Sequence, residues 1–333
     1  MSYLLEPLEK GNFYLKNRLI MPPMATSKSN EDGRVNQDIL NYYNEKSQGG
    51  YISLIIIEHS FITQKGKASD RQLSIAEDKF VDDLKKLAEI IHKNGSKTVM
   101  QINHAGGAAS KEVTGYEPVA PSAVPNPRKL KENTPEELTK EEIKDIIENF
   151  KDASLRVKRA GFDGVEIHSA HGYLLNQFFS PLTNKRNDEY GGDVQGRIRI
   201  HLEVIKAVRD AVGKDYPILL RLGATDNMEG GTSIEDSIAA AQSFENAGVD
   251  ILNISGGFCG YSAPNFKGQG FFSPITEAIK SAVSIPVILT GGVTDPKAAE
   301  KLLVDGKADL IGVGRAILNN SDWAKKAIET LSK

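Results

Sequence analysis

The sequence predicts an α/β fold in which residues 1–333 form a single domain, a closed (β/α)8 barrel. Short runs rich in Val, Ile and Leu alternate with longer amphipathic stretches along the whole chain. Apolar strands separated by helices are typical of a parallel sheet covered on both faces. Eight strand–helix units of this kind predict closure into a barrel. Hydrophobic residues make up 40% of the 333 residues, and no change in composition marks a domain boundary.

The expected strands share a nearly continuous apolar run of strand length, and they are Arg18–Met21, Ile52–Ile57, Thr98–Ile102, Gly164–His168, Ile218–Leu222, Ile251–Ile254, Pro286–Leu289 and Leu310–Val313. The expected helices repeat apolar residues at spacings of three and four. They are Asp78–Lys93, Lys140–Ala160, Gln195–Val212, Ile234–Ala247 and Pro296–Val304. A doubly wound open sheet is the alternative, but Pro22-Pro23 follows the first strand where that fold carries a glycine fingerprint.

Two segments lie outside this repeat. Residues Leu4–Leu15, with a turn signal at Lys10-Gly11-Asn12, predict an N-terminal hairpin that closes the lower end of the barrel. The loop after the third strand is roughly 35 residues long, whereas loops beyond about 12–15 residues are usually functional or disordered. Prolines stiffen this loop and favour a lid or pocket wall; they are Pro118, Pro121, Pro125, Pro127 and Pro135.

Charge, apolar runs and cysteine content argue against several classes of protein. The net charge of -3 gives no general reason to expect a nucleic acid or an anionic membrane as partner. Residues Met1–Lys10 lack the pattern of a signal peptide, and the apolar runs are too short to span a bilayer, so a cytoplasmic location is the default expectation. Cys259 is the only cysteine, which excludes a disulfide framework and a cysteine-ligated metal site within the chain.

The main functional signal is the run His168–Tyr173, where the fourth strand passes into a loop. Two imidazoles three residues apart can hold one oxygen atom, and the phenol of Tyr173 can supply a proton. A zinc site is a poor alternative because it needs a third protein ligand, and purely structural histidines remain open. His59 and His104 also end strands, whereas a helical pattern predicts surface positions for the remaining two, His92 and His201.

Glycines and arginines indicate a phosphate-bearing ligand. Gly291-Gly292 follows the seventh strand and Gly314-Arg315 follows the eighth, where barrels of this class bind phosphate. Turn glycines and a surface salt bridge of Arg315 are the alternatives. Gln101 and Arg221 close the third and fifth strands, and a basic residue among leucines needs a partner, either an internal carboxylate or a ligand anion.

Several motifs, in their order along the chain, resemble those of the Old Yellow Enzyme family of FMN-dependent ene-reductases. The resemblance extends over nearly the full length of the chain. The motifs that carry the resemblance are Lys16-Asn17-Arg18 with Pro22-Pro23-Met24, Gln101 with His104-Ala105-Gly106, Ala120-Pro121-Ser122, Gly161 to His168, Ala170-His171-Gly172-Tyr173, Ser180-Pro181, Asn184, Arg186, Asp188, Tyr190-Gly191-Gly192, Gly291-Gly292 and Gly314-Arg315.

The resemblance implies an NAD(P)H oxidoreductase that reduces the C=C bond of an electron-poor alkene by ping-pong hydride transfer through flavin N5. His168 and His171 would bind the activating oxygen of the substrate, and Tyr173 would protonate carbon. The expected FMN contacts are Pro23, Met24 and Ala25 beside the ring, His59 at a strand end, Gln101 and Arg221 at the pyrimidine edge, and Gly291, Gly292, Gly314 and Arg315 at the phosphate.

Three residues depart from the pattern of many relatives. Ala25 replaces Thr or Cys, Gly107 replaces Arg, and Ser27 replaces a Tyr found in one subclass. These changes affect the expected flavin potential and substrate size. An iron–sulfur cluster is not expected, because the cysteine-rich stretch of the longer relatives is missing. A homo-oligomer is possible, and the alternative functions are a flavin-binding electron donor and a barrel lyase acting on a phosphorylated substrate.

Overall fold

A computed structural model describes residues 2–10, 13–127, 134–262 and 268–333. Its centre is a closed barrel of parallel strands in the order β10-β11-β12-β3-β4-β5-β8-β9, which confirms the predicted barrel. Each predicted strand is present with small changes at its ends. The strands are β3 (Leu19–Met21), β4 (Leu54–Phe61), β5 (Lys97–Asn103), β8 (Gly164–Ser169), β9 (Ile218–Gly223), β10 (Ile251–Ser255), β11 (Val287–Thr290) and β12 (Leu310–Gly312).

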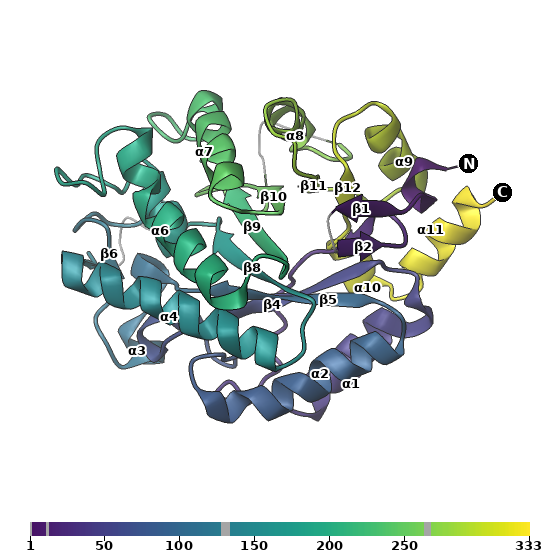
Figure 1. Ribbon diagram of the computed structural model, residues 1–333, viewed down its shortest axis with the longest axis horizontal. Helices are drawn as coiled ribbons and strands as arrows, with labels where there is room; N and C mark the ends of the chain where they lie inside the picture. Colours follow the sequence, from purple (N-terminus) through teal and green to yellow (C-terminus); the bar gives the residue numbers. More distant parts are fainter. Residues whose placement is uncertain (1, 11–12, 128–133, 263–267) are drawn as a thin grey trace.

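Helices surround the barrel, as Figure 1 shows for α1, α2, α4, α6 and α7. Side chains cap the first turns of α1, α4, α6, α7 and α9; at the start of α4, Thr139 and Glu142 form a reciprocal capping box. The predicted helices are confirmed within three residues at each end. The helices are α1 (Gln37–Ser47), α2 (Val81–Lys93), α3 (Lys111–Thr114), α4 (Lys140–Arg159), α5 (Leu174–Phe179), α6 (Val194–Val212), α7 (Ile234–Asn246), α8 (Ser273–Lys280), α9 (Pro296–Val304), α10 (Arg315–Asn319) and α11 (Trp323–Leu331).

The lower end of the barrel is closed by the predicted hairpin, formed by β1 (Leu8–Lys10) and β2 (Phe13–Leu15). Gly11 and Asn12 of the predicted turn lie outside the described residues. Apolar side chains of the hairpin pack in one cluster with inward-facing residues of the barrel strands, so the hairpin fills this end. The cluster comprises Leu8, Phe13, Leu15, Ile20, Leu54, Ile56, Val99, Leu219, Ile251, Ile288 and Leu310.

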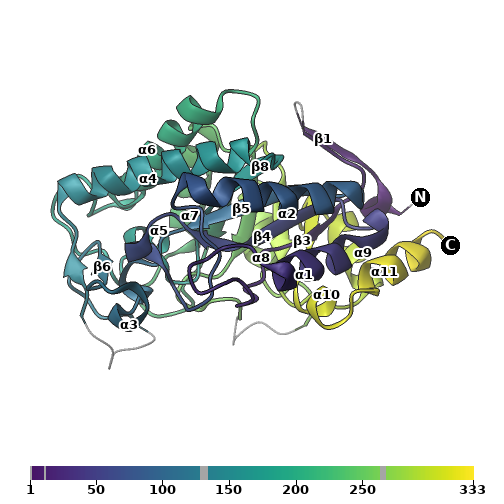
Figure 2. The same ribbon diagram turned by 90° about the horizontal axis from the view of Figure 1, so that it is seen from below.

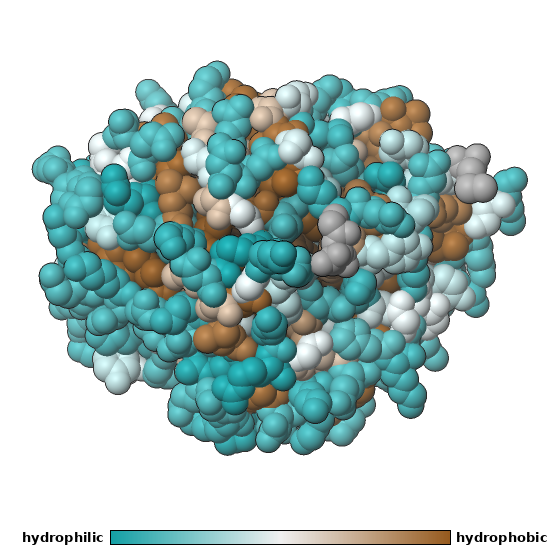
Figure 3. All heavy atoms as spheres, in the orientation of Figure 1, coloured by the Kyte–Doolittle hydropathy of each residue, from teal (hydrophilic) through white to brown (hydrophobic). Residues whose placement is uncertain are grey.

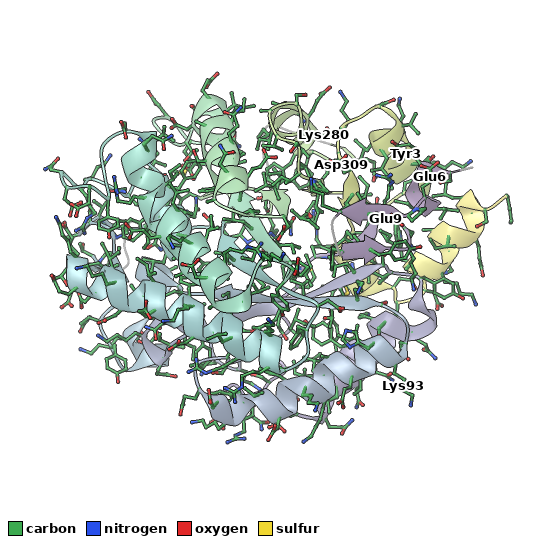
Figure 4. All side chains as sticks on the ribbon, viewed as in Figure 1. Tyr3, Glu6, Glu9, Lys93, Lys280 and Asp309 are labelled. Carbon is green, nitrogen blue, oxygen red and sulfur yellow. The ribbon has the colours of Figure 1, made fainter. Side chains whose placement is uncertain are left out.

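Polar contacts also join the segments at this end. The Lys280 ammonium lies 2.5 Å from the Asp309 carboxylate, and Figure 4 shows the two residues beside each other. Near the N-terminus, the Arg18 guanidinium lies over the Tyr3 ring at 4.6 Å from its centroid. The N-terminal segment and α11 lie on the same side of the molecule in Figures 1 and 2.

The long loop after β5 contains short ordered elements in its described part: η5 (Gly106–Ala108), α3, β6 (Val119–Ala120) and β7 (Glu136–Glu137). The remaining 3-10 helices are η1 (Tyr3–Leu5), η2 (Gln48–Gly50), η3 (Gln64–Gly66) and η4 (Asp78–Phe80). Tyr116, Val119 and Leu138 of this loop line a pocket of about 370 Å³ together with α4 and residues 63–65 after β4.

The face of the molecule in Figure 3 is mostly hydrophilic, with separate apolar patches. Among the described residues, no helix combines the length and the apolar character needed to cross a membrane.

Candidate active site

One cavity of about 440 Å³ lies where the barrel strands end, and every site residue predicted from the sequence lines it. These residues are Pro23, Met24, Ala25, His59, Gln101, His168, His171, Tyr173, Arg221, Gly291, Gly292, Gly314 and Arg315. The wall also includes residues that the sequence reasoning did not single out as site residues: Pro22, Tyr261, Thr290, Val293, Thr294, Gly312 and Leu318. Residues spread over the chain therefore meet at one end of the barrel.

A tight turn between β8 and α5 presents His171 and Tyr173 to this cavity. His171 has a left-handed backbone, with φ at 61°, which is uncommon for a residue that carries a Cβ. Its N–H donates to the carbonyl of Gly256 over 3.1 Å, and the next N–H, of Gly172, donates to the Asn176 side chain over 2.7 Å. Surrounding bonds thus hold a strained turn, as is typical of functional sites.

The rings around the turn form a compact cluster. The centroid of His168 lies 5.2 Å from that of His171 and 5.1 Å from that of Tyr173, with each pair edge-to-face. Burial and then His171, Arg221 and His59 lower the pKa of His168 well below its usual value, so its ring is neutral at pH 7. Burial raises the pKa of Tyr173 to about 12, which keeps its phenol protonated.

Ser255, at the end of β10, contacts one of the histidines. Its hydroxyl lies 2.8 Å from Nε2 of His171. Because Ser255 is buried within β10, this contact orients the His171 ring. The sequence reasoning missed Ser255, since the contact joins residues that are 84 positions apart.

A network of buried polar side chains connects Gln101 and Thr290, two residues that line the cavity. Glu166 accepts hydrogen bonds from Gln101 over 2.9 Å and from Asn253 over 2.8 Å, and Asn253 in turn accepts one from Thr290 over 3.1 Å. Burial raises the pKa of Glu166, while Arg221 opposes the shift. Arg221 is only 4% exposed and forms no direct ion pair within 4 Å in the described part of the chain. The charge of the buried Glu166 carboxylate nevertheless favours the charged form of Arg221, so an internal carboxylate acts on it without direct contact.

At the other side of the cavity, Gly314 and Met24 bring two walls together. A Cβ at Gly314 would lie 2.8 Å from the Met24 sulfur, so a larger residue here would require the Met24 side chain to move. Gly292 has φ at 71°, a backbone conformation that favours glycine. Arg315 is exposed and has no ion pair among the described residues, so the alternative of a surface salt bridge is not observed.

The segment Pro22–Ala25 is anchored by the residue that follows it. The backbone N–H and the hydroxyl of Thr26 both donate to the Glu58 carboxylate on β4, the hydroxyl over 2.8 Å. Glu58 is 4% exposed, and burial raises its pKa to about 7 against the opposing hydrogen bonds of Thr26 and the charge of Lys28. Glu58 thus links a wall of the cavity to the barrel.

Two other histidines considered in the sequence analysis, His104 and His201, are buried in the fold and do not line the cavity. His104 is buried outside the cavity, where its Nδ1 accepts a bond from the Gly106 N–H over 3.0 Å. The surface position predicted for His201 is wrong, because this residue is fully buried, bonds Ser169 over 2.8 Å and stacks on Phe244. Its spacing of three from Ile198 would have placed it on the buried face of α6.

Within the described residues, no group of three or more His, Cys, Asp or Glu side chains could hold a metal ion. Buried polar atoms beside the cavity fit an organic ligand instead. Nε of Arg221 and Nδ1 of His168 have no hydrogen-bond partner in the described structure. Buried polar groups are nearly always paired, so unpaired atoms here are expected where a ligand supplies the partner.

A family model described as the NADH:flavin oxidoreductase / NADH oxidase family matches residues 3–333. The chain belongs to this family. An NADH oxidase from Thermoanaerobacter brockii is 43% identical over 96% of this chain and 50% of its own length. An NADPH dehydrogenase from Clostridium acetobutylicum is 40% identical over 93% of this chain and 89% of its own. The chain spans about half the length of the first of these relatives.

A solved structure of an old yellow enzyme homologue from Zymomonas mobilis superposes with a TM-score of 0.85 and 28% identity, over 98% of this chain and 92% of that one. The family membership and this likeness confirm the predicted resemblance. FMN is the flavin of the family, and the names of the relatives indicate NADH or NADPH as electron donor, as predicted.

Proposed function

We propose that the protein is an FMN-dependent NAD(P)H oxidoreductase that reduces the C=C bond of α,β-unsaturated carbonyl compounds. The observation that carries this proposal is the cluster of His168, His171 and Tyr173 in the wall of a cavity whose other residues suit a flavin. When bound, FMN supplies hydride transfer between a nicotinamide and an organic substrate. The chain then has to hold the flavin, polarise the substrate and deliver a proton.

The residues present fit FMN. Arg221 contributes a buried positive charge and an unpaired Nε, and fixed charges act most strongly in dry sites. Glu166 holds the amide nitrogen of Gln101, which leaves the Gln101 oxygen to accept a bond from a ring N–H. Arg315 and the glycine backbone would hold the phosphate. The proposed contacts are Pro23, Met24, Ala25, His59, Gln101, Arg221, Gly291, Gly292, Gly314 and Arg315.

His168 and His171 would bind the carbonyl oxygen of the substrate. His168 is neutral because of the pKa shift caused by burial, so it can donate one hydrogen bond without carrying a charge. The contact with Ser255 orients His171. Donors placed in advance around an oxygen stabilise the negative charge that develops on it during reaction, which is the same principle as an oxyanion hole.

Tyr173 would deliver the proton to carbon. Its phenol is protonated at pH 7, and it lies against both His168 and His59, with ring centroids 5.1 and 5.3 Å away. General acid catalysis by a positioned side chain contributes about 10²–10⁴-fold to a rate.

The proposal is tested with the purified protein. We expect a yellow protein whose flavin is released by denaturation and is identified as FMN. Under anaerobic conditions NADH or NADPH should bleach the flavin, and 2-cyclohexenone should restore its colour with formation of the saturated ketone. Bleaching without reoxidation by a panel of enones would favour an electron donor, and the lack of flavin would contradict both functions.

A further inference from the structure

Gln72 lies behind the cavity, in the loop after β4, and is only 4% exposed. The orientation of its amide is fixed by the backbone. The N–H of Ala68 donates to Oε1 of Gln72 over 2.7 Å, so this atom is the oxygen and the other is the nitrogen. The Gln72 side chain therefore presents an N–H donor, and not an acceptor, to the neighbouring residue on the cavity side.

The group beyond it is His59. Nε2 of Gln72 lies 2.8 Å from Nδ1 of His59 and 3.1 Å from the His59 carbonyl oxygen. The two protons of Gln72 Nε2 are therefore both donated to acceptors of His59. The amide nitrogen of Asn103 lies 3.4 Å from the same Nδ1. A ring nitrogen that faces the fixed Gln72 donor at 2.8 Å has to accept, so in the neutral ring the proton is on Nε2.

Nε2 has no hydrogen-bond partner among the described residues, and His59 lines the cavity. The ring is stacked on Tyr173 with an interplanar angle of 29° and faces His168 edge-on at 6.2 Å. Burial, followed by the charge of Arg221, lowers the pKa of His59 to about 4, so the ring is neutral at pH 7.

We propose that Gln72 is a positioning residue that keeps the proton of His59 on Nε2, which makes His59 a third imidazole hydrogen-bond donor of the cavity. The acceptor is a carbonyl oxygen, either of the bound cofactor or of the substrate. The tautomer is a property of the chain alone, whereas the use of the donor rests on the proposed function.

The tautomer is tested by NMR on the uniformly ¹⁵N-labelled protein, with His59→Phe used to assign the His59 signals. At pH 7 we expect a protonated Nε2 and an unprotonated Nδ1. A proton on Nδ1 in the unmodified protein would overturn the proposal, whether or not the protein proves to be an ene-reductase.

The role of Gln72 is tested with Gln72→Glu, which keeps an oxygen for the Ala68 N–H but replaces the donor by an acceptor. We expect Nδ1 of His59 to become protonated. Gln242→Glu is the matched control, because the Gln242 amide bonds a carbonyl on the exposed surface of α7, and it should leave His59 unchanged. An unprotonated Nδ1 in folded Gln72→Glu would show that Gln72 does not set the tautomer.

The donor role is tested with His59→Phe, which keeps an aromatic ring beside Tyr173 and removes the N–H. Loss of one neutral hydrogen bond weakens binding by about 2- to 10-fold. A rise in the Kd for FMN would assign the acceptor to the cofactor, and a rise in KM for 2-cyclohexenone at saturating FMN would assign it to the substrate. If neither constant changes, His59 is not a donor in the cavity.

Discussion

The phenol of Tyr173 owes its proposed role to its surroundings. Burial raises its pKa to about 12, so it keeps its proton at neutral pH. Substitution Tyr173→Phe removes the proton and retains the ring. We expect alkene reduction to slow by about 10²–10⁴-fold, while FMN binding and reduction by the nicotinamide persist.

Stopped-flow measurement of the two half-reactions would separate these effects, because the nicotinamide half-reaction serves as the internal control. Unchanged reoxidation by an enone would show that another group supplies the proton.

Ala25 provides a second test at the scale of a residue. It lines the cavity where many relatives carry a hydroxyl or thiol, so its methyl group offers no hydrogen bond to the flavin. We expect Ala25→Thr to raise the midpoint potential of bound FMN, because a donor stabilises added negative charge. Ala25→Val, of nearly the same shape as Thr but without the hydroxyl, is the control in a spectroelectrochemical titration. Equal potentials in the two variants would contradict the prediction.

At the scale of elements, Glu58 connects β4 to the segment after β3. Its pKa is raised to about 7, above the ordinary value of 4.5, mainly by burial. A carboxyl group whose pKa is raised by folding stabilises the folded state when protonated. Its contribution is therefore complete below about pH 4.5 and is lost as the pH rises through 7.

Glu58→Gln is expected to remove this pH dependence, which amounts to about 3 kcal/mol in the free energy of unfolding. Urea denaturation at a series of pH values between 4.5 and 8 would measure it. Glu89→Gln, on the exposed face of α2, is the control and should keep the pH profile of the unmodified protein. The same profile in both variants would mean that Glu58 does not titrate in this range.

For the whole molecule, the hairpin and the cavity occupy opposite ends of one barrel. Leu15 is fully buried in the cluster that closes the lower end, whereas its neighbour Tyr14 is 48% exposed. We expect Leu15→Ala to lower the free energy of unfolding by about 2–5 kcal/mol because it leaves a cavity, with Tyr14→Ala within about 0.5 kcal/mol of the unmodified protein.

Neither hairpin variant should alter the Kd for FMN, which fluorescence titration would measure in the folded proteins. A weaker Kd in Leu15→Ala alone would show that the two ends of the barrel are coupled.

That residues 1–333 form one domain stays a prediction.

The sequence determined the barrel and most of the cavity wall. Each strand is a local apolar run, and the carboxyl ends of parallel strands all lie at one end of a barrel, so polar residues at these ends converge there. Periodicity also located α2, α4, α6, α7 and α9. It missed α1, whose sequence Gln37–Ser47 is largely polar, as well as α8, α11 and the short helices α3, α5 and α10. The sequence reasoning also assigned His201 to the wrong face of α6.

Only the tertiary structure decided which side chains hold the site residues. Ser255 orients His171, Glu58 anchors Thr26, and Gln72 directs its amide at His59. A hydrogen bond requires two atoms within about 3 Å in a suitable direction. Loops and strand register set such distances after folding, and no local pattern in the sequence encodes them. The sequence therefore determined which residues reach the cavity, and the folded chain determined their orientation and protonation.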